Sequence, residues 1–207
     1  MNRLDFAARA RALAQRPDLD AAPPAAPPSP EARMSREGVP QRYLGCSLAN
    51  WQARQPGMSE ARLAVTAFMA DPVDHWLALI GRHGTGKTHL ACACLRERGG
   101  RYTTARGLVQ RILSASCRWD ERDRFANAGL LVIDEIPSGA MRDVEYDVLY
   151  DVLDARYAER RPCVLVANAT AAQFRGVLRP ALADRFAEVG IAVGCEWESW
   201  RAGHAGM

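Results

Sequence analysis

The segment Gly81–Thr88, with the sequence GRHGTGKT, has the G-x-x-x-x-G-K-[ST] spacing of a phosphate-binding loop. In such a loop the backbone amides surround the phosphates of a nucleotide, the lysine reaches the β- and γ-phosphates, and the last hydroxyl binds Mg²⁺. Lys87 is the only lysine in the chain. A compact ammonium fits between two phosphates better than a planar guanidinium does, so its retention at this position indicates a nucleoside triphosphate site.

The residues on both sides of the loop have the pattern that this kind of site requires. Trp76–Ile80 is a short apolar run typical of a buried strand, and His89–Leu95 continues as a helix whose first amides would face the phosphates. A glycine-rich turn that arose by chance would lack this context. The predicted nucleotide-binding residues are Gly81, Arg82, His83, Gly84, Thr85, Gly86, Lys87, Thr88 and His89.

Short apolar runs alternate with segments of helical periodicity along most of the chain. The predicted strands are Trp76–Ile80, Gly100–Ala105, Leu130–Ile133, Cys163–Ala167 and Val189–Val193, and the predicted helices are Ser59–Ala70, His89–Leu95, Arg106–Ser116, Arg142–Arg160, Ala171–Leu178 and Pro180–Ala187. Ser59 is the expected N-cap of the first of these helices. Strands that alternate with helices, taken together with the phosphate loop, predict a three-layer α/β/α parallel-sheet P-loop NTPase.

Two adjacent carboxylates, Asp134 and Glu135, follow the apolar run Leu130–Ile133. We expect Asp134 to hold Mg²⁺ through water and to support Thr88, whose hydroxyl would be a direct ligand. Glu135 is the expected general base that polarises the attacking water. Either carboxylate alone is compatible with an ordinary loop, but the pair in this position indicates hydrolysis. A metabolite kinase activates a hydroxyl acceptor instead of water, so the adjacent acid argues against that class.

Two further polar residues occupy positions that would complete a hydrolytic site. Asn168 ends the next apolar run, beside the strand of Glu135, where an amide can orient the attacking water and sense the γ-phosphate. The alternative for Asn168 is an ordinary turn residue. Arg185 is a candidate arginine finger that acts on the nucleotide of a neighbouring subunit. Its alternative is a surface ion pair with Asp184 or Glu188.

The first forty residues differ in composition from the rest of the chain. Residues 1–16 are rich in arginine and alanine, with apolar residues at loosely helical spacing. They predict a partner-binding helix or, alternatively, a solvated tail. Residues 17–40 are the predicted Pro/Ala-rich linker, in which the stretch Ala21–Pro30 is expected to be extended and semi-rigid. Residues 41–207 form the expected ATPase domain, because a chain of 207 residues suits one domain with a short appendage.

The composition also limits the compartment and the partners. No apolar stretch approaches membrane-spanning length, and the N-terminus lacks the apolar segment of a secretion signal. The six cysteines include no C-x-x-C pair, which favours reduced thiols over a metal site or disulfide framework. These features predict a cytoplasmic protein with no membrane partner. Because the net charge is only +3, contact with DNA would depend on locally grouped arginines.

On these motifs the chain resembles the AAA+ ATPases of the DnaC/IstB type, the bacterial and phage helicase loaders and transposition helpers. The resemblance covers about Gly38 to Arg201. The phosphate loop corresponds to Walker A, Leu130–Glu135 to Walker B, Val166–Thr170 to sensor 1 and Ala183–Phe186 to the arginine-bearing box VII helix. The ending Glu196–Arg201 is similar to the terminal segment of DnaC-type loaders.

The resemblance implies an AAA+ core without a C-terminal lid domain, which binds ATP and Mg²⁺, hydrolyses ATP and forms an ATP-dependent homo-oligomer. The implied catalytic residues are Lys87, Glu135, Asn168 and Arg185, and the implied metal-binding residues are Thr88 and Asp134. The implied function is the loading of a DnaB-type replicative helicase. The alternative is an IstB-like transposition helper that acts on duplex DNA with a transposase. A module that uses ATP only as a switch would need neither Glu135 nor Arg185.

The resemblance also implies a site for single-stranded DNA, because in AAA+ loaders the region after the second strand faces the central channel. Arg106, Arg111 and Arg118 would contact phosphates there, with Trp119 as a stacking surface. Acidic residues interleave with these arginines, so a solvated charged loop is the alternative. DnaC-type loaders also carry a larger N-terminal domain than this chain does, so helicase binding would have to use the segment Arg3–Arg16.

Overall fold

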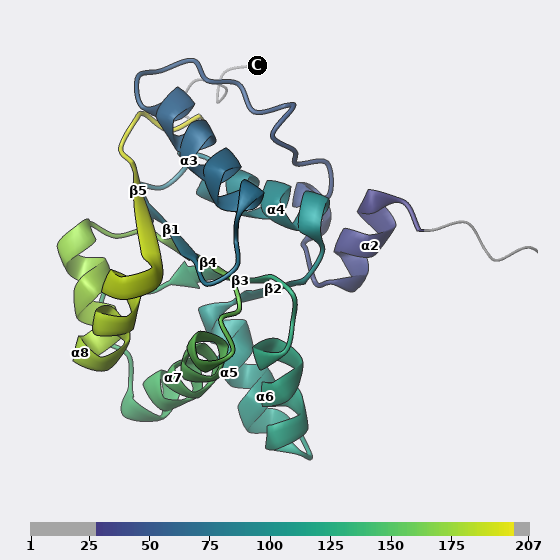
Figure 1. Ribbon diagram of the computed structural model, residues 1–207, viewed down its shortest axis with the longest axis vertical. Coiled ribbons are helices and arrows are strands. Elements are labelled where there is room, and N and C mark those ends of the chain that lie inside the picture. The colour runs from purple at the N-terminus through teal and green to yellow at the C-terminus, as the bar shows by residue number, and fades with distance from the viewer. Residues whose placement is uncertain (1–27, 201–207) are drawn as a thin grey trace, which may run out of the picture.

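The computed structural model describes residues 28–200 and shows a sheet between two layers of helices (Figure 1). In chain order the elements are α2 (Pro30–Arg36), η2 (Gln41–Tyr43), α3 (Met58–Ala70), β1 (Trp76–Gly81), α4 (Lys87–Arg98), β2 (Arg101–Thr104), α5 (Ala105–Ser114), α6 (Arg118–Ala126), β3 (Leu131–Ile136), α7 (Asp143–Ala158), β4 (Cys163–Ala167), α8 (Ala171–Val189) and β5 (Gly190–Cys195). The strand order is β2-β3-β4-β1-β5, and every pairing is parallel. The predicted three-layer fold is confirmed.

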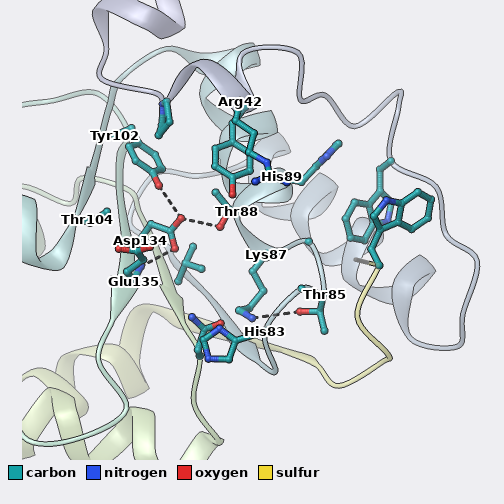
Figure 2. Close-up of a pocket in the computed structure, with 18 of the residues that line it drawn as sticks. Arg42, His83, Thr85, Lys87, Thr88, His89, Tyr102, Thr104, Asp134 and Glu135 are labelled. Carbon is teal, nitrogen blue, oxygen red and sulfur yellow. Dashed lines mark hydrogen bonds between the residues drawn. The ribbon is translucent and has the colours of Figure 1, made fainter. Parts of the chain in front are cut away.

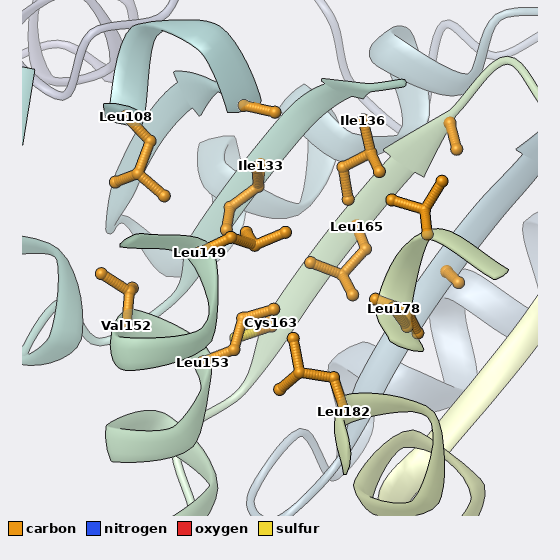
Figure 3. Close-up of a cluster of buried hydrophobic side chains, with 14 of the residues drawn as sticks. Leu108, Ile133, Ile136, Leu149, Val152, Leu153, Cys163, Leu165, Leu178 and Leu182 are labelled. Atoms are coloured by element: carbon orange, nitrogen blue, oxygen red, sulfur yellow. The ribbon is translucent and has the colours of Figure 1, made fainter. Parts of the chain in front are cut away.

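Helices cover both faces of the sheet because its inner strands are apolar on both sides. Helices α3 and α4 lie over one face, and α5, α7 and α8 lie over the other, with α6 packed against α5 and α7 (Figure 1). Each layer encloses a cluster of buried apolar side chains. Figure 3 shows the cluster on the α7 and α8 side, where Leu149 and Leu153 of α7 and Leu178 and Leu182 of α8 lie around Leu165 of β4.

The strand order explains where a ligand can bind. Strand β1 is the first in the chain but lies inside the sheet, between β4 and β5. The chain crosses from β1 to β2 at the sheet edge, returns through β3 and β4, and adds β5 on the other side of β1. The carboxyl ends of parallel strands lie along one edge, where ligands bind in open α/β sheets. The residues that follow β1, β3 and β4 are therefore brought together.

The folded region begins before residue 41, the predicted start of the ATPase domain. Pro30–Arg36 forms α2, and the Ser29 hydroxyl caps this helix by accepting a hydrogen bond from its backbone. Met34 is fully buried in the same core cluster as α3 and α4 residues. Residues 30–36 of the predicted linker thus form a packed helix, because a serine cap followed by proline starts a helix. The predicted helix at 1–16 lies outside the described residues.

Smaller differences concern the ends of helices. Helix α3 begins at Met58 with Gly57, at φ 83°, as its N-cap, so Ser59 is not the cap. Helix α6 forms where a charged loop was the alternative to DNA contact. Helix α8 bends at Arg179, with φ 53°, because the following Pro180 disfavours helical geometry before it. Two separate helices were predicted there.

All six cysteines are free, and all except Cys117 are buried. Within residues 28–200, none of the helices has both the length and the apolar character needed to cross a membrane.

Candidate nucleotide-binding site

A cavity of about 570 Å³ lies at the carboxyl ends of the strands, over the first turn of α4 (Figure 2). It brings together most of the residues that the sequence predicted for the site: His83, Gly84, Thr85, Gly86, Lys87, Thr88, His89, Asp134, Glu135 and Asn168. Gly81 and Arg82 lie behind the cavity, where their carbonyls accept hydrogen bonds from Lys87.

The ammonium of Lys87 lies inside the curve of the phosphate loop (Figure 2). Its Nζ donates to the carbonyls of Gly81 at 3.1 Å and Arg82 at 2.5 Å, and to the hydroxyl of Thr85 at 3.3 Å. Lys87 is only 4 % exposed, and this burial lowers the pKa of its side chain. The loop therefore holds the Lys87 ammonium among carbonyl and hydroxyl oxygens. The phosphate oxygens of a bound nucleotide would replace these oxygens as hydrogen-bond acceptors.

Asp134 connects the phosphate loop to the acidic end of β3. Its Oδ2 accepts hydrogen bonds from the hydroxyls of Thr88 and Tyr102, each at 2.8 Å, and its Oδ1 accepts one from the Glu135 amide at 2.7 Å (Figure 2). Burial and the nearby Asp134 carboxylate raise the pKa of Tyr102, so this hydroxyl keeps the proton that it donates. Hydroxyl and carboxylate oxygens are ligands that suit Mg²⁺.

A β-bulge in β3 directs both acidic residues to the cavity. Ile133 pairs with Leu165, but the next pair is Ile136 with Ala167, so β3 contains one extra residue between the two pairs. Glu135 has φ 55°, which is uncommon for a residue with a side chain and is typical of functional sites. The bulge returns Ile136 to the core and leaves Glu135 exposed at the cavity. The strand predicted from the sequence ends at Ile133, and the bulge was not predicted.

Asn168 follows β4 directly and lines the same cavity. Strand β4 pairs with β3, so Asn168 lies next to the strand that carries Glu135, as the sequence predicted. The turn after Asn168 is closed by the capping box of α8, in which Thr170 and Gln173 exchange hydrogen bonds. This placement leaves the Asn168 amide at the carboxyl end of the sheet, where the γ-phosphate of a nucleotide in the loop would lie.

Arg185 lies away from the cavity of its own chain. Its guanidinium pairs with Asp154 of α7 and lies over the rings of Tyr150 and Tyr157, at 5.2 and 5.4 Å from their centroids. The alternative prediction for Arg185 was a surface ion pair with Asp184 or Glu188. The acid that it contacts is instead Asp154, on the neighbouring helix. A role on a neighbouring subunit's nucleotide stays a prediction.

The arginines predicted to bind DNA lie on two neighbouring helices. Arg106 and Arg111 are on α5, Arg118 begins α6, and all three side chains are exposed. Trp119, next to Arg118, is 71 % exposed. The later arginines of α6 are ion-paired with acidic residues of the same helix. The exposed set therefore combines guanidinium groups with one indole ring.

The aromatic residues that surround the site were not predicted from the sequence. Tyr43, Trp51 and Trp200 line the cavity, and Tyr102 reaches Asp134 from β2. Trp200 belongs to the ending Glu196–Arg201 that carried part of the family resemblance, and Tyr43 lies near the start of the region that the resemblance covers. Trp51 and Tyr102 had no signal in the sequence, because their contacts depend on which elements become neighbours in the fold.

The chain is similar in sequence to a family of ATP-binding proteins and to individual bacterial proteins. A family model described as "IstB-like ATP binding protein" matches residues 50–204. The chain is 26 % identical over 187 residues to the uncharacterised protein YdaV of Escherichia coli strain K12. This alignment covers 83 % of this chain and 74 % of YdaV. It is 27 % identical over 191 residues to the replicative helicase loader DnaC of the same strain, over 81 % of this chain and 74 % of DnaC.

A solved structure shares this fold. The crystal structure of the DnaC helicase loader aligns with a TM-score of 0.67 and 18 % sequence identity, over 75 % of this chain and 99 % of that chain. At this level of identity the structural likeness supports the fold, and the family model and the sequence relatives support the family.

Proposed function

The chain belongs to the family of IstB-like ATP binding proteins, and from this premise we propose that it is an AAA+ ATPase that loads a DnaB-type replicative helicase. The observation that carries the proposal is the 2.8 Å hydrogen bond from Thr88 to Asp134, which joins the phosphate loop to the acidic strand end in one cavity. Similarity to a helicase loader over 81 % of the chain supports the biological role.

Hydrolysis of ATP requires neutralised phosphate charge, an oriented water and a base. Lys87 and the loop amides bind the phosphates. Thr88 and Asp134 would hold Mg²⁺, which when bound would supply positive charge that offsets the charge of the phosphates. Glu135 accepts a proton from the water that attacks the γ-phosphate, and Asn168 orients that water from the neighbouring strand. The products are ADP and phosphate.

Self-association supplies the remaining catalytic group. Arg185 lies outside the cavity of its own chain, so it can act in hydrolysis only on the nucleotide of a neighbouring subunit. A nucleotide held between two copies of the chain makes assembly depend on ATP, because the ligand then binds the assembled form preferentially. We therefore include an ATP-dependent homo-oligomer in the proposal.

Single-stranded DNA is the proposed nucleic-acid ligand. The exposed Arg106, Arg111 and Arg118 provide charge for phosphates, and the exposed Trp119 provides a ring on which a base can stack.

The second candidate function is an IstB-like transposition helper on duplex DNA, which the description of the matching family model favours. Both functions use the same ATP chemistry, and both take place on DNA, so we place the protein in the cytoplasm.

An association assay separates the two functions. We expect immobilised full-length chain to retain the purified replicative helicase of its own host when Mg²⁺ and ATP are present. We expect Lys87→Ala to retain much less helicase, because it lacks the ammonium that binds the phosphates.

Deletion of residues 1–20 should abolish helicase retention and leave ATP hydrolysis intact. Retention of a transposase on duplex DNA, without helicase, would favour the second function, and helicase retention by the deletion variant would place the docking surface elsewhere.

Tyr102→Phe should raise the Mg²⁺ concentration required for ATP binding by about three- to tenfold, because it removes one of the two hydroxyls that orient Asp134. The measurement is a MgCl₂ titration of the binding of a fluorescent ATP analogue, which needs no turnover. Tyr146→Phe is the matched control, since Tyr146 is also 7 % exposed and donates to the Leu178 carbonyl. An unchanged Mg²⁺ requirement in Tyr102→Phe would remove this residue from the site.

A further inference from the structure

The C-terminal end of the described chain crosses the outer side of the phosphate loop. We call residues 196–200, which follow β5, the strap. The indole Nε1 of Trp197 donates to the Thr85 carbonyl at 2.8 Å, and the backbone amide of Trp200 donates to the Gly84 carbonyl at 2.9 Å. In Figure 2 the strap is the yellow ribbon that runs past Thr85. Two consecutive carbonyls of the loop are therefore bound from outside.

The contact between the strap and the loop is closely packed. A Cβ atom at Gly84 would collide with the Ser199 side chain, and one at Gly86 would lie 2.5 Å from the ring of Trp51. Trp51 in turn meets Trp197 edge to face, with ring centroids 6.3 Å apart. The loop glycines thus fit against side chains from both ends of the domain.

The direction of these hydrogen bonds matters for phosphate binding. A trans peptide unit is planar, and its carbonyl and the amide of the next residue point in opposite directions. Fixing the Gly84 carbonyl outward therefore turns the Thr85 amide inward, and fixing the Thr85 carbonyl outward turns the Gly86 amide inward. Inward-pointing consecutive amides are the anion-binding feature of a phosphate loop.

We propose that the strap is a positioning element that holds the phosphate loop in its anion-binding shape, with Trp197 as the main positioning residue. The inference deepens the proposed function and rests on it, because the ligand is the same ATP. Thermodynamic linkage makes the effect reciprocal, so ATP in the loop stabilises docking of the strap by the same factor. The strap is then held more firmly when nucleotide is bound.

The test compares Trp197→Phe with Trp76→Phe in the full-length chain. Phenylalanine keeps an aromatic ring but removes the indole N–H in both variants. Trp76 is a matched control because it is 1 % exposed and donates from Nε1 to the Arg161 carbonyl at 3.2 Å, at the amino end of β1. We expect the affinity for ATP with Mg²⁺ to fall about fivefold in Trp197→Phe and to stay at the wild-type value in Trp76→Phe.

Hydrogen exchange of the Trp200 amide gives a second readout that a purely structural role would not move. We expect this amide to exchange about fivefold more slowly when ATP and Mg²⁺ saturate the wild-type chain, since ATP and the strap stabilise each other. Equal ATP affinity in wild type and Trp197→Phe, or exchange at Trp200 that ATP does not change, would overturn the inference. Failure of the wild-type chain to bind ATP would instead overturn the proposed function.

Discussion

Glu135→Gln is expected to retain ATP binding while its rate of ATP hydrolysis falls by at least about 100-fold. Glutamine has the same shape as glutamate but cannot accept a proton from the attacking water. The residues that bind the nucleotide in our proposal, Lys87, Thr88 and Asp134, are unchanged in this variant. The bulge that places Glu135 at the cavity is a backbone feature, so the substitution should leave the geometry of β3 intact.

The measurement is steady-state phosphate release alongside binding of a fluorescent ATP analogue. Glu159→Gln is the control, because Glu159 is an exposed glutamate at the end of α7, away from the cavity. It should hydrolyse ATP at the wild-type rate. If Glu135→Gln also turned over normally, the base would have to be another group, and if it failed to bind ATP, the loss of turnover would say nothing about proton transfer.

The phosphate loop and the polar strand ends were predictable because they follow local patterns. The glycine and lysine spacing of Gly81–Thr88 identifies a phosphate site without any tertiary information. Asp134 and Asn168 each follow an apolar run, and the geometry of a parallel sheet places such residues along one edge. In the structure Thr88 accordingly donates a hydrogen bond to Asp134, and Asn168 lines the same cavity.

The residues that support the site were not predictable, because their partners are chosen by the fold. Trp197 reaches Thr85 across 112 positions of sequence, and no spacing rule connects two such positions. Tyr102 meets Asp134 only because β2 pairs with β3. The positive φ of Glu135 depends on the pairing of β3 with β4, which sequence alone does not give.

Composition was misleading at the start of the domain. The proline- and alanine-rich stretch before residue 30 suggested that the linker would continue to residue 40. The short helix α2 carries a single fully buried side chain, Met34, and one apolar residue is too weak a periodic signal to identify a helix. Its packing against the rest of the domain is what stabilises it.

Arg185→Ala is expected to lower the rate of ATP hydrolysis about 10³-fold or more while each subunit still binds ATP, because an arginine finger neutralises charge that develops in the transition state. Arg160→Ala is the matched control. Arg160 is another arginine that is ion-paired with an aspartate, Asp74, on the surface of the domain. It should hydrolyse ATP normally. Normal turnover in Arg185→Ala would leave the residue as a structural partner of Asp154 only.

Mixing two inactive variants tests whether Arg185 acts on a neighbouring subunit. Glu135→Gln subunits keep Arg185, and Arg185→Ala subunits keep Glu135. The active site of an Arg185→Ala subunit is therefore complete when its neighbour is a Glu135→Gln subunit, which supplies the arginine. In a head-to-tail assembly mixed at random in equal amounts, roughly a quarter of the interfaces have this arrangement, and hydrolysis should recover to about that fraction of the wild-type rate. Recovery cannot occur if Arg185 acts within its own subunit, because every subunit in the mixture would then lack either the base or the arginine. A mixture that stays inactive, although both variants bind ATP and co-assemble, would therefore contradict action between subunits.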